Sequence, residues 1–281
     1  MHTEIVSVHN ERVKHWSRLL EKKGRDREQK FIVEGVHLVC EALASDLSVE
    51  TVAYSKERGI PAEVARWHAT AADRVEWIAV SEQVLAKCTD AQTPQPVFAV
   101  VAKPRWNEDM LFAARDSLVL VADGVRDPGN VGTMIRRADA VGATGVVLGK
   151  GTADPFNPKT VRSTMGSLFR VPVIEADLGP LLIRAKQSGA QLVQASLQAN
   201  CSCYEADLTK PTWLIVGNEA AGVSPEIARL ADLNVVIPMR GSAESLNVAM
   251  ASTVLMFEAA RQRYFSPNKN SCPSIKIIVR R

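Results

Sequence analysis

The clearest absences in the sequence are a long apolar run and a secretory signal. No apolar run in the 281 residues approaches the roughly 20 residues that a membrane-spanning helix needs. The first residues, MHTEIVSVHNERVK, carry charges but no apolar core, so we expect no secretory signal there. A hydrophobic fraction of 46% and a charged fraction of 23% are typical of a soluble globular protein.

Cysteine and histidine are also scarce. The cysteines are odd in number and scattered, which argues against a disulfide framework and favours a reducing cytoplasm. Cys201 and Cys203 form a Cys-x-Cys pair, but no second pair or nearby histidine completes a zinc site. All five histidines lie at or before residue 68. We therefore expect structural or surface thiols and no bound metal.

The charge of the chain is only mildly basic. A net charge of +3 permits a polyanionic partner without requiring one. Between residues 10 and 30, basic residues outnumber acidic ones by roughly two to one. Val13, Trp16, Leu19 and Leu20 recur there at helical spacing, with lysines and arginines elsewhere on the helix. A solvated helix face and a contact with a polyanion both remain open.

The first hundred residues alternate apolar runs with helical patterns, which predicts a compact α/β domain. Strands are expected at 31–35, 49–55, 75–81 and 96–102, and helices at 36–46, 61–70 and 81–88. The polar segment KPRWNEDM (103–110) is the expected linker.

A second alternation begins near residue 117 and predicts a mostly parallel sheet covered by helices on both faces. Strands are expected at 117–122, 145–149, 169–174, 190–196, 213–217 and 233–239. The last and longest helix is expected at 245–263, with a loose tail over 266–281.

The stretch DGVRDPGNVGTMIRRADAVG (123–142) follows the first of these strands. Strand, glycine turn and helix is the arrangement with which nucleotide-binding folds hold a phosphate. The turn lacks the Gly-x-Gly-x-x-Gly spacing of dinucleotide sites, and no P-loop lysine follows it. Both of those nucleotide-site classes are excluded.

Two later junctions have the same form. In WLIVGNEAAGVSPEI (213–227), Ser224 and Pro225 are suited to opening a helix, and Ser245 could cap the final helix. Loops at the carboxyl ends of parallel strands are where a ligand should bind. These loops are rich in backbone donors and poor in acids, which favours a neutral-to-cationic small ligand over a divalent metal.

Three ordered motifs in these loops resemble those of the SpoU/TrmH family of the SPOUT superfamily, the knotted ribose 2′-O-methyltransferases that modify RNA with S-adenosylmethionine. NVGTMIR resembles the first motif and supplies Asn130 and Arg136. GNEAAG resembles the second motif, and IPMRGSAESLN resembles the third. The segment 154–173 is similar to the family's connecting segment, so the resemblance covers nearly all of 117–263.

The N-terminal half is similar to the substrate-binding extension of two-domain family members, whose fold is related to kink-turn-binding ribosomal proteins. The resemblance implies an RNA-binding domain at 1–103, a linker at 104–116, a methyltransferase domain at 117–265 and a tail at 266–281. It also implies a C-terminal trefoil knot, a cytoplasmic homodimer and a cofactor site near the dimer interface.

The resemblance further implies roles for individual residues. The motif positions expected to bind S-adenosylmethionine are Gly217, Asn218, Gly222, Ile237, Met239 and Leu246. The positions expected to be catalytic are Asn130, Arg136, Glu219, Ser245 and Asn247. Arginine stays protonated near neutral pH, so Arg136 is better suited to fixing a phosphate and stabilising the forming alkoxide than to acting as a base.

Each of these residues also has a plain structural interpretation. Asn130 could be a turn residue, Arg136 a solvated helix residue, Ser245 only a cap, and Glu219 a surface acid. A catalytically silent RNA-binding protein and a base methyltransferase are alternatives for the whole chain. Ribosomal RNA of the large subunit (23S) is favoured over tRNA because two-domain relatives mostly act there. The expected RNA contacts are Lys22, Lys23, Arg25, Arg27, Arg137 and Arg162.

Overall fold

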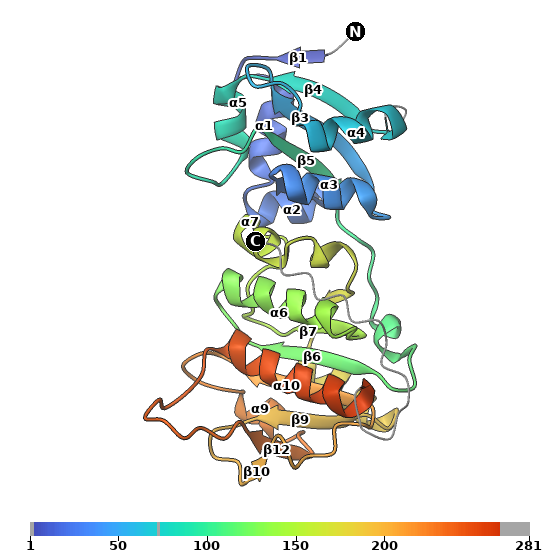
Figure 1. Ribbon diagram of the computed structural model, residues 1–281, viewed down its shortest axis with the longest axis vertical. Helices are drawn as coiled ribbons and strands as arrows, with labels where there is room; N and C mark the ends of the chain where they lie inside the picture. Colours follow the sequence, from blue (N-terminus) through green and yellow to red (C-terminus); the bar gives the residue numbers. More distant parts are fainter. Residues whose placement is uncertain (1–2, 72–73, 265–281) are drawn as a thin grey trace. The chain divides into compact units, whose positions relative to one another are not determined.

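The computed structural model describes residues 3–71 and 74–264, which form two compact units (Figure 1). Unit 1 comprises Met1–Trp106, Asp127–Arg136 and Ala153–Val173. Unit 2 comprises Asn107–Arg126, Arg137–Thr152 and Ile174–Arg281. The predicted tail at 266–281 lies outside the described residues.

Unit 1 is built on a mixed sheet with the strand order β1-β4-β3-β5-β2. β4 is parallel to β1 and β3, whereas β5 is antiparallel to β2 and β3. Its strands are β1 (Thr3–Ile5), β2 (Lys30–Glu34), β3 (Val49–Ser55), β4 (Glu76–Val80) and β5 (Val97–Ala102). Its helices are α1 (Glu11–Arg18), α2 (Lys22–Glu28), α3 (Val36–Ala44), α4 (Ala62–Ala71), α5 (Glu82–Cys88), α7 (Pro158–Thr164) and the 3₁₀ turn η2 (Ser167–Phe169).

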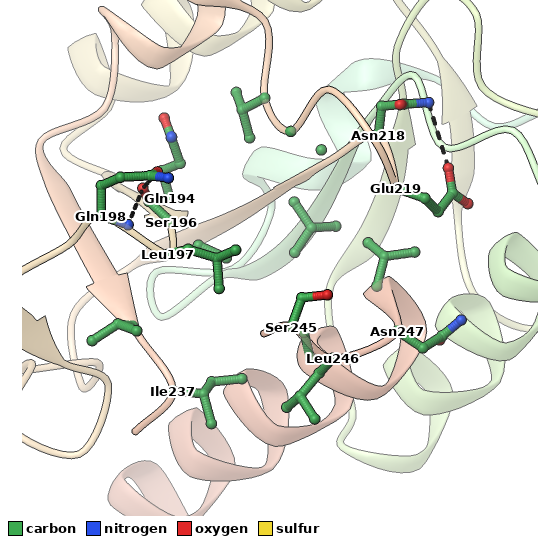
Figure 2. Close-up of a pocket in the computed structure, with 18 of the residues that line it drawn as sticks. Gln194, Ser196, Leu197, Gln198, Asn218, Glu219, Ile237, Ser245, Leu246 and Asn247 are labelled. Atoms are coloured by element: carbon green, nitrogen blue, oxygen red, sulfur yellow. Dashed lines mark hydrogen bonds between the residues drawn. The ribbon is translucent and has the colours of Figure 1, made fainter. Parts of the chain in front are cut away.

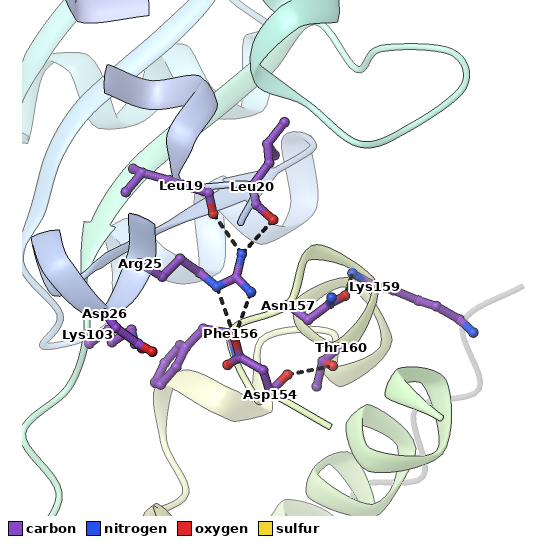
Figure 3. Close-up of polar contacts among 10 residues, drawn as sticks. All are labelled: Leu19, Leu20, Arg25, Asp26, Lys103, Asp154, Phe156, Asn157, Lys159 and Thr160. Atoms are coloured by element: carbon purple, nitrogen blue, oxygen red, sulfur yellow. Dashed lines mark hydrogen bonds and ion pairs between the residues drawn. The ribbon is translucent and has the colours of Figure 1, made fainter. Parts of the chain in front are cut away.

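The basic stretch at 10–30 forms two helices rather than the single helix that its periodicity suggested. Val13, Trp16 and Leu19 are buried as expected, and Trp16 packs edge-on against Phe98. The chain turns after α1, and the Arg25 guanidinium donates to the carbonyls of Leu19 and Leu20, both at 2.8 Å (Figure 3). Arg25 therefore satisfies carbonyls at the end of α1 that a continued helix would have paired internally.

A segment of the second half of the chain completes the core of unit 1. The buried Phe31 ring on β2 contacts Phe156 at 5.0 Å and Phe169 at 6.4 Å between ring centroids. In the same segment, Asp154 accepts hydrogen bonds from Arg25 Nη2 at 2.6 Å and Nε at 3.1 Å (Figure 3). This connecting segment thus packs as part of the same unit as residues 1–106.

Unit 2 is built on a sheet with the strand order β10-β12-β9-β11-β6-β7-β8. Every neighbouring pair with a defined register is parallel, which confirms the predicted parallel sheet. Its strands are β6 (Leu118–Asp123), β7 (Gly145–Leu148), β8 (Val173–Glu175), β9 (Gln191–Ala195), β10 (Cys201–Ser202), β11 (Thr212–Gly217) and β12 (Leu233–Val236). Its helices are η1 (Glu108–Phe112), α8 (Leu178–Gln187), α9 (Pro225–Ala228) and α10 (Val248–Tyr264), and α6 (Pro128–Ala140) runs from unit 1 into unit 2.

Three predictions about element boundaries in the second half are wrong. The strand expected at 233–239 ends at Val236. The strand expected at 169–174 starts only at Val173, because Phe169 ends a 3₁₀ turn and Pro172 has no backbone donor for a ladder. The final helix begins at Val248 rather than at Ser245. Its cap is Asn247, whose Oδ1 accepts from the backbone N–H groups of Ala249 and Met250.

Within the described residues, no helix combines the length and the apolarity that crossing a membrane would need.

Candidate functional site

A pocket in unit 2 lies where three parallel strands end (Figure 2). Its walls come from the loops that follow β9, β11 and β12, together with the residues that lead into α10. The cavity has a volume of about 500 Å³. Small-molecule sites occupy roughly 300–1,000 Å³ and favour the carboxyl ends of parallel strands.

Most of the residues singled out in the sequence meet in this pocket. Nine of them line it: Gly217, Asn218, Glu219, Gly222, Ile237, Met239, Ser245, Leu246 and Asn247. They come from two loops about twenty residues apart in the sequence, which the sheet brings together. Asn130 and Arg136 are not among the lining residues and lie on the part of α6 that belongs to unit 1.

The two glycines of GNEAAG allow the backbone of the loop to turn tightly. Asn218 and Gly222 exchange two backbone hydrogen bonds of 2.9 Å. A Cβ on Gly217 would overlap the backbone of Gly222 and Val223, and Gly222 has a φ of +72°. Only glycine fits both positions without strain, so this tight loop explains the motif spacing.

Asn218 organises the loop from inside. Its Oδ1 accepts from the N–H groups of Ala220 and Ala221 at 3.0 Å, and its Nδ2 donates to Gly124 O at 2.9 Å. The Glu219 carboxylate accepts from Asn218 Nδ2 and from Arg126 N, each at 3.4 Å. The loop therefore presents an exposed carboxylate from a fixed backbone.

The start of α6 is held by a carboxylate and a lysine. Asp127 Oδ1 accepts from Asn130 N at 2.8 Å, and Lys159 Nζ lies 2.7 Å from Asp127 Oδ2. The Lys159 hydrogen bond and the backbone donor of Asn130 lower the pKa of Asp127. Arg136, two turns further along the helix, is exposed.

The third wall of the pocket, at the end of β9, was not predicted from the sequence. Gln194, Ser196, Leu197 and Gln198 line it, and Ser196 Oγ donates to Gln198 Oε1 at 3.1 Å (Figure 2). Gln194 is 8% exposed, and its Oε1 has no hydrogen-bond donor among the residues described. The available signal was a polar residue between apolar neighbours, because Gln194 lies between Val193 and Ala195.

The predicted RNA contacts differ in their surroundings. Lys22, Lys23 and Arg27 are exposed, and Arg137 is half-buried. Arg162 donates to Glu34 at 3.3 Å and to Asp90 at 2.8 Å. The prediction of Arg25 as an RNA contact is corrected by its burial. Its side chain is only 2% exposed and pairs with Asp154 inside unit 1, so it does not face a phosphate.

Within residues 3–71 and 74–264, no group of three or more His, Cys, Asp or Glu side chains could hold a metal ion.

Comparison with known proteins decides the family. Residues 117–257 match the SpoU rRNA Methylase family, and residues 10–99 match the MRM3-like substrate binding domain. The chain belongs to the SpoU rRNA methylase family. The three motifs found in the sequence thus identified the family correctly.

Two SpoU-family relatives resemble this chain over almost their whole length. A Bacillus subtilis protein named 23S rRNA (guanosine(2553)-2′-O)-methyltransferase RlmP is 40% identical over 254 residues, which cover 90% of this chain and 98% of the relative. A Streptomyces viridochromogenes protein named 23S rRNA (uridine(2479)-2′-O)-methyltransferase is 35% identical and covers 92% of each chain.

Two solved methyltransferase structures share the fold. The SpoU methyltransferase AviRb from Streptomyces viridochromogenes, in complex with the cofactor AdoMet, has a TM-score of 0.81 at 34% identity and covers 90% of this chain and 98% of its own. An AdoMet-bound rRNA methyltransferase from Sinorhizobium meliloti has a TM-score of 0.82 at 35% identity, with coverages of 92% and 97%.

Proposed function

We propose that this SpoU-family chain transfers a methyl group from S-adenosylmethionine to a ribose 2′-hydroxyl of 23S ribosomal RNA. The observation that carries the proposal is the convergence of nine motif residues on one cavity. The names of the relatives from Bacillus subtilis and Streptomyces viridochromogenes support 23S rRNA as the substrate.

The chemistry of the pocket fits S-adenosylmethionine. The walls carry apolar side chains such as Ile237 and Leu246, which suit a flat adenine ring. The Glu219 carboxylate suits the cationic part of the cofactor, and Gln194 offers an acceptor that lacks a donor. Gly217, Asn218, Gly222 and Met239 would form the remaining walls, with Asn218 holding the loop in shape.

The bound cofactor supplies an electrophilic methyl group on a sulfonium. The chain's task is then to align the ribose oxygen with that methyl group and to make the oxygen more nucleophilic. Arg136 is proposed to fix the adjacent phosphate and to stabilise the developing negative charge on the 2′-oxygen. Asn130, Glu219, Ser245 and Asn247 are proposed to orient Arg136 and the ribose.

Residues 1–103 are proposed to bind the RNA, residues 104–116 to link the two domains, and residues 117–265 to form the methyltransferase domain. The match of residues 10–99 to a substrate-binding domain supports this division. Lys22, Lys23, Arg27, Arg137 and Arg162 remain the proposed phosphate contacts. A cytoplasmic location is proposed because the relatives' named substrate is ribosomal RNA.

The chain is also proposed to be a homodimer. The helix α10 leaves Met250 and Phe257 45% and 49% exposed, at positions seven residues apart on one side of the helix. Exposed apolar side chains of this size favour a protein partner, and a second copy of the chain is the proposed one. A trefoil knot near the C-terminal end and a kink-turn-binding ancestry of the N-terminal domain are proposed from the family resemblance.

Methyl transfer from tritiated S-adenosylmethionine to unmodified RNA tests the function. We expect incorporation into a 23S rRNA transcript and little into 16S rRNA or tRNA. Exclusive labelling of tRNA would replace the proposed substrate. Cofactor binding without transfer to any RNA, including precursor ribosomal particles, would favour a silent RNA-binding protein.

A further inference from the structure

Gln194 is an exceptional residue in the core of unit 2. It lies on β9 between the buried Val193 and the loop that begins at Ser196, and it is itself more than nine-tenths buried. Its Oε1 has no donor within the part of the chain that the structure describes. Buried side-chain acceptors are nearly always paired, so an unpaired one beside a cavity indicates a donor supplied by a ligand.

The surroundings of Gln194 indicate which part of the ligand reaches it. Gln194 pairs across the sheet with Ile215 of β11 and Asn234 of β12, and the next residues of those strands, Val216 and Val235, are apolar and line the pocket. The apolar Leu197 lies near it as well (Figure 2). Glu219 stands on the opposite side (Figure 2). A cation is drawn toward the carboxylate of Glu219, which leaves the neutral end of the ligand for Gln194.

We propose that Gln194 recognises the adenine ring of the cofactor through its side-chain amide, an inference that rests on the proposed use of S-adenosylmethionine. At its N6/N7 edge, adenine presents an amino donor beside a ring-nitrogen acceptor, and a glutamine amide presents the complementary acceptor and donor. At the same edge hypoxanthine presents two acceptors, O6 and N7, so neither orientation of the amide gives the Gln194 oxygen a donor. Gln194 would thereby select adenosyl over inosyl ligands.

The test compares the binding of two ligands that differ only at this group, S-adenosylhomocysteine and S-inosylhomocysteine, by isothermal titration calorimetry on the full chain. The wild type should bind the adenosyl ligand about 10- to 100-fold more tightly, the range expected for one bidentate amide–base pair. The variant Gln194→Met keeps the length of the side chain but has no amide. It should bind both ligands with similar affinity.

Gln191→Met is the matched control on the same strand. Gln191 donates to Asp207 O at 3.1 Å and does not line the pocket. This variant should keep the full preference for the adenosyl ligand. Thermal unfolding of both variants shows whether each is folded, and the wild-type preference can be measured whatever the variants do.

Four outcomes are informative. A wild type that binds both ligands equally overturns the role of Gln194 and leaves the proposed function standing, as does a folded Gln194→Met protein that keeps the wild-type preference. A wild type that binds neither S-adenosylhomocysteine nor S-adenosylmethionine overturns the proposed function together with this inference. Loss of the preference in Gln194→Met alone supports it.

Discussion

At the scale of single residues, Arg25 shows how position within a basic stretch can mislead. Its neighbours Lys22, Lys23 and Arg27 are exposed, whereas Arg25 is 2% exposed and bonds Asp154, Leu19 and Leu20. From composition alone, all four cations were predicted to contact RNA. Only the fold distinguishes a guanidinium that joins two segments from those that face solvent.

Removal of the Arg25 guanidinium should destabilise unit 1 strongly. In Arg25→Met, Asp154 is left as a buried carboxylate without its partner, and we expect the free energy of unfolding to fall by about 3–5 kcal/mol. Arg27→Met breaks an exposed pair with Glu28 and should cost at most about 1 kcal/mol. Urea denaturation of the two variants measures the difference, and equal effects would contradict the structural role of Arg25.

At the scale of elements, two neighbouring residues before α10 are expected to have different roles, one as the helix cap and the other in the site. Asn247 caps the helix, so Asn247→Ala should lower the free energy of unfolding by about 0.5–2 kcal/mol. Ser245 is exposed and lies before the helix, so Ser245→Ala should change stability by less than about 0.5 kcal/mol while reducing methyl transfer. A stability loss in Ser245→Ala as large as that in Asn247→Ala would contradict this assignment and indicate that Ser245 caps the helix.

The start of α6 should respond to pH through Asp127. The pKa of Asp127 is lowered mainly by the hydrogen bond from Lys159, so this carboxylate stabilises the fold above its ordinary pKa. That contribution is lost as the pH falls through the lowered value. Lys159→Met should therefore raise the pKa of Asp127 toward its ordinary value, as measured by NMR titration. Lys87→Met, on α5, should leave it unchanged, and an unmoved Asp127 in Lys159→Met would contradict the assignment.

The sequence predicted most elements because their patterns are long and regular. The strand at Val49–Ser55 matches its prediction at both ends, since most of its residues are β-branched or apolar. β1 and β10, of three and two residues, were missed because so few residues carry no periodicity. Two of the pocket's walls were predicted from the spacing of the motifs. The wall at Gln194 was not predicted, because the burial of a single glutamine depends on tertiary packing.

At the scale of the whole molecule, the proposed homodimer follows from an apolar face of α10. Phe257→Glu places a charge on that face and should convert the protein to monomers, because burying an unpaired charge in an interface costs free energy. Size-exclusion chromatography with light scattering measures the mass. A wild-type protein that is monomeric at micromolar concentration would contradict the proposed homodimer.

The compact units also cut across the two halves of the chain. Residues 153–173 follow β7 of the methyltransferase region, yet they pack with residues 1–106 through Phe31 and Arg25. Asp127 and Lys159, which hold the start of α6, lie in that same unit. Residues 1–106 and the segment that contains Asn130 are therefore parts of one compact unit.

The most direct test of the central claim is the identity of the methylated nucleoside and its dependence on Arg136. After reaction with S-adenosylmethionine, nuclease digestion and mass spectrometry of 23S rRNA should yield one 2′-O-methylnucleoside. Arg136→Ala should lower the transfer rate by about 100-fold or more with unchanged cofactor affinity. The control variant Arg229→Ala, which lies outside the pocket, should transfer methyl groups at the wild-type rate. A base-methylated product, or undiminished transfer by Arg136→Ala, would contradict the account.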